Sequence, residues 1–275
     1  MKELDFNGAR VVLSESEAFQ MKIEHEQDIM IPLTIKENVF CSLFIECNKA
    51  ALVTMKMEME ENSHCTLLFW NHCSGTIQFH EEITLQRDAV LNLSFGELSD
   101  GCATRHTEVH LRGENAQVNL FSAILTQSAK EYTILCEHHV PFTYSTIKNY
   151  FVLLEKGVCK IDATGRINKG ALGSKSHQVS KGLTFGSQKS AVILPQLLID
   201  ENDVEASHAA TLGQIDENQM YYLQSRGMSE RQATQLITYG YLLPIAEAIK
   251  DEALKQKCIH QIEMKVSELC LMSTK

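Results

Sequence analysis

The sequence predicts a mainly β protein whose chain ends in a helical segment. Short runs in which apolar and polar residues alternate fill residues 25–206, and they are rich in Val, Ile, Leu, Thr and Phe. Such alternation is the signature of β-strands, and clusters of polar, turn-forming residues separate the runs. From about residue 214 to 272 the apolar residues follow helical spacing instead, and β-branched residues become rare.

The β-rich part contains a loose repeat. A polar turn followed by an alternating strand recurs in ENSHCTLLF (61–69), RDAVLNLSF (87–95), ENAQVNLFS (114–122), EKGVCKIDA (155–163), SQKSAVILP (187–195) and ENDVEASHA (201–209). The spacing between these units varies, so they match no strict short period. Irregular repetition favours a β-solenoid, in which each coil buries its apolar face against its neighbours. A sandwich or an antiparallel barrel remains an alternative, because periodicity does not give strand direction.

The two ends of the chain differ from this middle part. Residues 1–24 are polar, and we predict that they are either disordered or form one short helix. Residues 213–275 are predicted to form a helical domain, which assigns residues 25–212 to the β core.

The helical segment has well-marked helix ends. Four residues are placed to start helices: Asp216, Ser229, Pro244 and Asp251. Asp216 and Ser229 each have a glutamine three positions later, which is the pattern of a capping box. Gly227 and Gly240 are placed to end the first two helices, because glycine readily takes the left-handed conformation of a C-cap. In the last segment, apolar residues three and four positions apart predict one apolar helix face.

Composition and motifs disfavour several classes of function. The 275 residues carry a net charge of −10, whereas nucleic acids and anionic membranes attract positive surfaces, so neither is expected as a partner. The chain has no apolar run of about 18 residues to span a membrane and no apolar signal-peptide centre near its start, so we expect a cytoplasmic protein. The motifs GxxxxGK[ST], GxSxG, HExxH and GxGxxG are absent, so any use of ATP would require a partner that binds it.

The nine cysteines are scattered at irregular spacing and include no CxxC pair. Neither a disulfide framework nor a short-loop zinc site is therefore expected. We predict that most of them are reduced, half-buried and packed as small hydrophobic residues.

Two histidine pairs were considered as metal ligands. His106 and His110 share a strand face with Glu108, and such a donor set could hold zinc or iron. Four residues along a strand separate two side chains by about 13 Å, so we predict an exposed polar face and no shared ion. His138 and His139 are adjacent and point to opposite faces of a strand, which disfavours a site that uses both.

His208 is the strongest single candidate for chemistry. It stands between the small side chains of Ser207 and Ala209, immediately before the change from strands to helices. A neutral imidazole could bind iron or transfer a proton near physiological pH, and a structural histidine bonded to a backbone carbonyl is the alternative. Residues 166–183 are a second candidate, for an anion or an acidic partner, although we favour a solvated hairpin; their cations are Arg166, Lys169, Lys175 and Lys181.

Residues 191–242 contain five motifs in a fixed order. They are P-x-L-x-I at 195–199, N-D-V at 202–204, S-H-A-A-T at 207–211, G-x-I-D at 213–216 and Y-L-x-S-R-G at 222–227. Together they closely resemble the SufB/SufD core family of the SUF iron–sulfur cluster assembly system. The resemblance covers about residues 90–270 and weakens toward the N-terminus.

This resemblance implies a fold and a set of partners. The fold is a right-handed parallel β-helix followed by a C-terminal helical domain. The partners are a SufC-type ABC ATPase bound to the C-terminal helices, and either a SufB-like subunit or a second copy of this chain, paired through the β-helices. The implied cofactor is a transient iron–sulfur cluster shared with that partner. The motif in the first helix supplies the candidate ATPase-binding residues Tyr222, Leu223, Arg226 and Gly227.

Within the family, the chain is more similar to SufD than to SufB. The cysteine that handles sulfur in SufB-type scaffolds aligns with Ser180, and a SufB-type glutamate aligns with Ala209. A hydroxyl cannot replace a thiolate in sulfur exchange. His208 matches a SufD-type histidine at the subunit interface, so the resemblance implies a SufD-like, non-catalytic subunit with His208 as a shared cluster ligand.

Two alternatives stay open at this point. The chain could be a scaffold that holds the cluster itself, using His208 with some of Cys159, Cys136 and Cys102. It could also be a β-helix enzyme, such as a lyase or transferase acting on saccharides. The second is disfavoured because the repeats contain no clustered acidic pairs or aromatic platforms.

Overall fold

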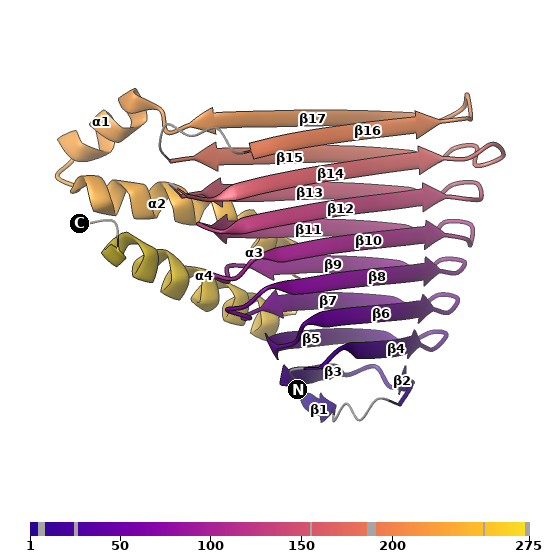
Figure 1. The fold of residues 1–275 in the computed structure, drawn as a ribbon. Helices are drawn as coiled ribbons and strands as arrows, with labels where there is room; N and C mark the ends of the chain where they lie inside the picture. Colours follow the sequence, from indigo (N-terminus) through magenta and orange to yellow (C-terminus); the bar gives the residue numbers. More distant parts are fainter. Residues whose placement is uncertain (5–8, 25–26, 155, 186–190, 250, 273–275) are drawn as a thin grey trace.

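The computed structural model describes residues 1–4, 9–24, 27–154, 156–185, 191–249 and 251–272. In these residues the chain alternates between two sheets, as Figure 1 shows. The nine-stranded sheet contains, in spatial order, β1 (Lys2–Leu4), β3 (Ala18–Glu24), β5 (Phe40–Lys49), β7 (His64–Asn71), β9 (Val90–Glu97), β11 (Gln117–Thr126), β13 (Tyr144–Leu153), β15 (Lys175–Thr184) and β17 (Glu205–Gln214). The eight-stranded sheet contains β2 (Val11–Leu13), β4 (Ile29–Ile35), β6 (Leu52–Met59), β8 (Ile77–Leu85), β10 (Ala103–Leu111), β12 (Ala129–His138), β14 (Val158–Ile167) and β16 (Ala191–Ile199).

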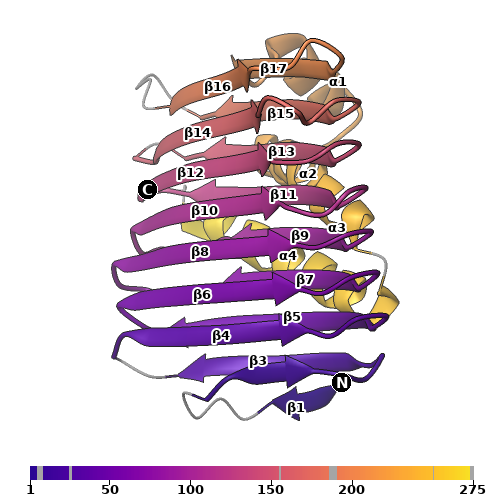
Figure 2. The ribbon, with the colours of Figure 1, turned by 90° about the vertical axis from the view of Figure 1, so that its right-hand side faces the viewer.

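Each strand inside a sheet pairs in parallel with the strands one coil before and one coil after it. Successive coils therefore stack into a parallel β-helix, and the sandwich and antiparallel barrel are excluded. Figures 1 and 2 together show that the coil is right-handed, as the resemblance implied. The segment 166–183 is not a hairpin, because β14 and β15 belong to different sheets.

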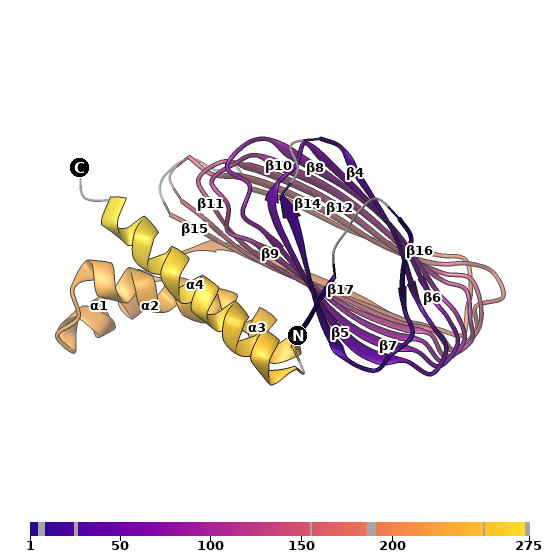
Figure 3. The same cartoon turned by 90° about the horizontal axis from the view of Figure 1, so that it is seen from below.

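The interior between the two sheets is the main hydrophobic core. In β8 and β10 every second side chain is buried and the others face outward, as the alternating sequence predicts. In β7 the run CTLLFWN is buried on both faces, because helices cover the outer face of the nine-stranded sheet near the strand ends. Figure 3, which views the molecule from below, shows that the helices lie along one side of the coil.

A repeated backbone conformation turns the chain at one corner of the coil. Asn38, Asn62, Asp88 and Asn115 all have φ between 56° and 61°, the left-handed region that asparagine and aspartate tolerate better than other non-glycine residues. Their side chains also bond from coil to coil: Asn62 Nδ2 donates to Asn38 Oδ1 at 2.6 Å, and Asn115 Nδ2 to Asp88 Oδ1 at 3.0 Å. The polar turns at the start of three sequence repeats, 61–69, 87–95 and 114–122, are corners of this kind.

The prediction that residues 1–24 are disordered or form a short helix was wrong for the residues that the structure describes. Residues 5–8 lie outside the described residues. In place of a helix or disorder, residues 1–24 contain β1, β2 and β3. Phe19, Met21 and Ile23 alternate with polar residues and are buried in the core, and β3 pairs with β5. Burial against the next coil outweighs the polar composition of this segment. The β-helix therefore begins before residue 25, and it ends at Gln214.

The C-terminal segment forms four helices: α1 (Glu217–Ser225), α2 (Glu230–Leu242), α3 (Pro244–Ala248) and α4 (Glu252–Met272). The predicted starts are confirmed, with capping bonds at Asp216 and Asp251, a full capping box at Ser229 and Pro244 at the first position of α3. Gly227 ends α1 with φ 91°. Gly240 does not end α2, which continues to Leu242 because that side chain is buried in the contact with the sheet.

The second hydrophobic cluster attaches three of these helices to the coil. Side chains of α2, α3 and α4, among them Leu242, Ile245 and Ile262, pack against Phe44, Trp70 and their neighbours on the nine-stranded sheet. Leu254, Cys258, Ile262 and Val266 form the predicted apolar face of α4. Among the described helices, none combines the length and apolar character needed to cross a membrane.

Candidate functional site

The last coil is the exposed end of the β-helix. β16 and β17 are the final strands of their sheets, and the described part of the chain places no strand beyond either of them. Several large apolar side chains are exposed there, on the outer face of β16 and on the interior face of β17. Val192, Leu194, Leu198 and Leu212 are each 40–46% exposed.

His208 lies on β17 at this end. Its register partner on β15 is Gln178, which is buried and faces the interior of the coil. His208 therefore faces the same interior from the last coil, where its ring is exposed. The sequence prediction of a histidine on the final strand holds, and the register adds the direction in which it points.

Ser180 faces the same interior one coil earlier. It pairs with Ala210, two residues beyond His208, so the two side chains share one face on neighbouring strands. Ser180 is buried and accepts a hydrogen bond from Asn149 Nδ2 at 3.1 Å. Asn149 Oδ1 in turn accepts one from Ser122 Oγ at 2.6 Å. Ser180 is thus part of a polar ladder inside the coil, while Ala209 lies on the opposite face of its strand.

The cysteines named for the scaffold alternative do not gather around His208. Cys136 and Cys159 are buried on β12 and β14 of the other sheet, and burial raises the pKa of each thiol to about 12. Cys102 is exposed but precedes β10. Of the eight cysteines whose side chains are described, all are free and seven are fully buried, which is deeper than the half-burial expected from the sequence.

Helix α1 follows β17 after a short connection and lies on the surface of the molecule. None of its residues is buried, and Tyr221 and Tyr222 are 74% and 56% exposed. The guanidinium of Arg226 lies over the ring of Tyr222, 5.7 Å from its centre. Leu223 is half-buried, and Gly227 supplies the left-handed turn after the helix.

A groove of about 300 Å³ runs between α1 and α2. Phe185, Ile215 and Met220 provide apolar surface, and Tyr221 and Glu230 line its rim. The candidate ATPase-binding residues are therefore on an exposed aromatic helix beside a partly apolar groove, adjacent in the chain to the strand that carries His208.

As predicted, the side chains of His106 and His110 on β10 do not come together around one position. His106 Nε2 contacts Glu108 Oε1 at 2.8 Å, whereas His110 turns toward Glu137 and His139 of the next coil. His138, as expected, points the other way and is buried. Burial lowers the pKa of His138 to about 4. The cluster of His110, Glu137 and His139 was missed by the sequence reasoning, because its members lie one coil apart.

Two other surfaces do not support a saccharide-binding cleft or an anion site. A groove on the eight-stranded sheet contains the carboxylates Glu58 and Glu82, but both are ion-paired, to Arg10 at 3.5 Å and to Lys56 at 3.2 Å. No aromatic side chain lines it, as a saccharide platform would require.

The basic stretch is also partly neutralised. Lys169 pairs with Glu201 at 3.5 Å and Lys175 with Glu205 at 2.8 Å. These pairs join β15 and its preceding turn to the following coil, which fits a solvated surface.

Comparison with known proteins agrees with this geometry. The family described as "SUF system FeS cluster assembly, SufBD core domain" matches residues 31–241, a range that starts within β4 and ends within α2. The chain belongs to the SufBD core family. Within it the chain is SufD-like: it is 30% identical over 202 residues to the iron–sulfur cluster assembly protein SufD of Escherichia coli, and 28% identical over 182 residues to SufD of Bacillus subtilis.

These alignments cover 72% and 66% of this chain but 47% and 42% of the two SufD proteins. A SufD of Plasmodium falciparum is 24% identical over 222 residues, which is 78% of this chain and 15% of that protein. The chain thus spans about half the length, or less, of the curated SufBD relatives that it matches.

Proposed function

We propose that this chain is a SufD-like, non-catalytic subunit of an iron–sulfur cluster assembly complex in the cytoplasm. In this proposal a SufC-type ABC ATPase binds the C-terminal helices. Its ATP-driven movement is transmitted to the last coil, where a shared, transient cluster is assembled with a second subunit. The match to the SufBD core family over residues 31–241 carries the proposal.

The exposed end of the coil supports a subunit interface there. The backbone groups on the outer edges of β16 and β17 have no neighbouring strand among the described residues, and such edges readily pair with another chain. The apolar side chains of the same coil, Val192, Leu194 and Leu198, need cover from water. A SufB-like subunit, or a second copy of this chain, would bury both features and bring His208 into the interface.

The position of α1 supports a coupling role. Exposed tyrosines beside a partly apolar groove suit a protein–protein contact, because aromatic side chains provide large, rigid contact areas. The connection from β17 to α1 is only two residues long, from Ile215 to Asp216. A displacement of α1 by a bound ATPase would therefore act directly on the strand that holds His208.

Copurification with the SufC-type ATPase encoded in the same genome tests the coupling. The double variant Y222A/R226A should lose the ATPase from a tagged complex, while F40A, which removes a similarly exposed aromatic ring from β5, should retain it. Failure of the wild-type chain to retain the ATPase, or equal retention by Y222A/R226A, would refute this part of the proposal.

Anaerobic cluster reconstitution tests the role of His208. With the partner subunits present, H208A should lose the charge-transfer absorbance of the cluster. H177A is the matched control, since His177 lies on the neighbouring strand but pairs with Ser207 on the opposite face. Absorbance acquired by this chain alone and lost in H208A would instead identify it as a scaffold.

A further inference from the structure

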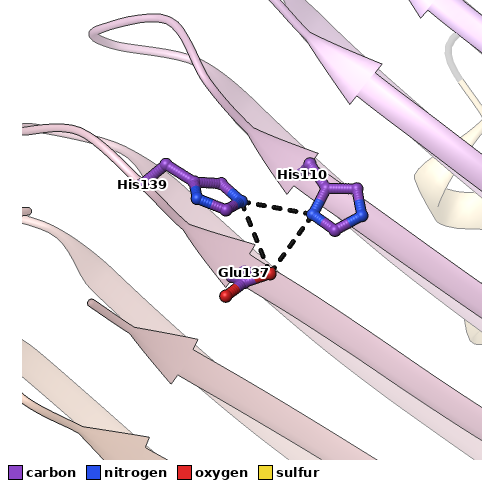
Figure 4. A group of neighbouring side chains, drawn as sticks. All are labelled: His110, Glu137 and His139. Atoms are coloured by element: carbon purple, nitrogen blue, oxygen red, sulfur yellow. Dashed lines mark hydrogen bonds and ion pairs between the residues drawn. The ribbon is translucent and has the colours of Figure 1, made fainter.

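Three potential metal ligands meet on the outer face of the eight-stranded sheet, as Figure 4 shows. The parallel register sets His110 of β10 opposite Glu137 of β12. His139 follows directly after β12 and is held by its backbone amide, which donates to the carbonyl of Leu111 at 3.1 Å. Glu137 and His139 are two residues apart and so lie on the same face, with His110 beside them.

The three facing atoms form a nearly equilateral triangle. His110 Nδ1 lies 3.2 Å from His139 Nε2 and 3.3 Å from Glu137 Oε2, and the last two atoms are 3.4 Å apart. A tetrahedral ion with bonds of about 2.0–2.1 Å holds its ligands roughly 3.3–3.4 Å from one another. The spacing of these three atoms therefore suits a single tetrahedral ion.

Neighbouring groups hold the ligands in this arrangement. Asn168 Nδ2 donates to Glu137 Oε1 at 3.0 Å, which leaves Oε2 as the oxygen that faces the rings. On the far side of the His110 ring, Nε2 lies 3.6 Å from Glu108 Oε2, which is an electrostatic contact beyond hydrogen-bond distance. The side chains of His110, Glu137 and His139 are 13%, 16% and 24% exposed, open to solvent on one side only.

We propose that His110, Glu137 and His139 bind a divalent transition-metal ion of the zinc or ferrous class. Two imidazoles and one carboxylate favour these ions over Mg²⁺ and Ca²⁺, which prefer sets of oxygen ligands. With three protein ligands, the fourth position is open to water or to a group from another molecule. The site lies on β10 and β12, away from the strand that carries His208, and it is independent of the function proposed above.

Titration of the metal-free, untagged full-length chain with Co²⁺ tests the proposal, because tetrahedral Co²⁺ gives a visible d–d absorption. The wild type should bind one equivalent, and Zn²⁺ should displace it. H110A and H139A should each weaken binding at least about tenfold. The matched control is H80A, which removes an exposed histidine from the outer face of β8 in the same sheet and should bind as the wild type does.

Co²⁺ could instead bind to cysteine thiolates, and the absorption spectrum distinguishes the two kinds of site. All of them remain in H139A, so thiolate binding would persist there with its charge-transfer bands. Undiminished Co²⁺ binding by both H110A and H139A, or no binding by the wild type, would overturn the proposal. Should either alanine variant misfold by circular dichroism, E137Q keeps the size of the side chain, and its undiminished affinity would equally overturn it.

Discussion

Replacing Lys130 with methionine should remove about 3–5 kcal/mol from the free energy of unfolding, the usual effect of breaking a buried ion pair from one side. Lys130 lies on β12 with its ammonium group inside the coil. Its three protons have three acceptors: Glu97 Oε1 at 2.8 Å, Ser99 Oγ at 2.8 Å and the carbonyl of Gly101 at 2.5 Å. Both members of the ion pair are buried, with side-chain exposures of 0% for Lys130 and 1% for Glu97.

The size of the effect follows from what the substitution leaves behind. Methionine fills most of the lysine volume, so little cavity is created. Glu97 would keep its bonds from Asn71, at 3.0 and 2.9 Å, and from Ser99 at 2.6 Å, but it would have lost its nearest counter-ion in the interior. Most of the loss should therefore be recovered in K130M/E97Q, which removes the uncompensated charge.

Urea unfolding followed by circular dichroism measures these differences, provided that the slope of the transition stays constant between variants. The matched control is K160M. Lys160 pairs with Glu131 at 2.5 Å on the outside of the same sheet, and their side chains are 45% and 48% exposed. Such surface pairs contribute about 0–1 kcal/mol. If K130M were no less stable than K160M, or K130M/E97Q no more stable than K130M, the network would not have the role argued here.

Three further outcomes follow from particular side chains. N62A should lower the free energy of unfolding in urea by about 1–2 kcal/mol, because Asn62 has φ 56° and alanine is strained in this left-handed conformation. N62G should stay close to the wild type, because glycine adopts this conformation freely. Equal losses in both variants would argue against backbone strain as the cause. His138 is neutral when folded, with its pKa lowered from 6.5 to about 4, so the unfolded chain binds more protons between these pH values and stability should fall as pH falls through that window. The fall attributable to His138 is about 3 kcal/mol, measured as the wild-type change minus that of H138N, and an identical pH profile for H138N would contradict it. In alkylation followed by mass spectrometry, Cys102 should react at least about tenfold faster than Cys136 and Cys159, whose pKa values burial raises to about 12; comparable rates would show that the coil opens readily.

The sequence predicts the strands of this protein better than their stacking. Alternating apolar residues mark β8 and β10, and the polar turns mark the corners with Asn62, Asp88 and Asn115. The coil length is not constant, however. Stacked side chains are 24 residues apart at Asn38 and Asn62, 27 at Asp88 and Asn115, and 31 at Asn149 and Ser180. A drifting length hides the period, and only the family resemblance supplied the parallel arrangement in advance.

The two features that the sequence did not reveal, β3 and the contact of His110 with His139, both depend on pairing between strands one coil apart. β3 was overlooked because Phe19, Met21 and Ile23 are apolar in a polar segment, and their strand is stabilised by pairing with a strand farther along the chain. His110 and His139 meet across 29 residues, a separation that means nothing until the register is known. His106 and His110, close in sequence, contact opposite oxygens of Glu108, and only His110 also reaches the next coil. In a solenoid, neighbours in space are one coil apart, so sites escape a search for short motifs.

The same stacking rule explains why the exposed end of the coil and the proposed interface coincide. Each inner coil covers its predecessor, as Ser180 covers Asn149 and is covered in turn by β17. Among the described residues β17 has a neighbouring strand on one side only, so His208 and Leu212 project into an interior that no later described coil closes. Since leaving apolar side chains and strand edges in water is unfavourable, a covering surface would stabilise this end. In the complex proposed above, a residue placed there would become an interface residue by position alone, and His208 is the one titratable side chain that the described part of β17 directs inward.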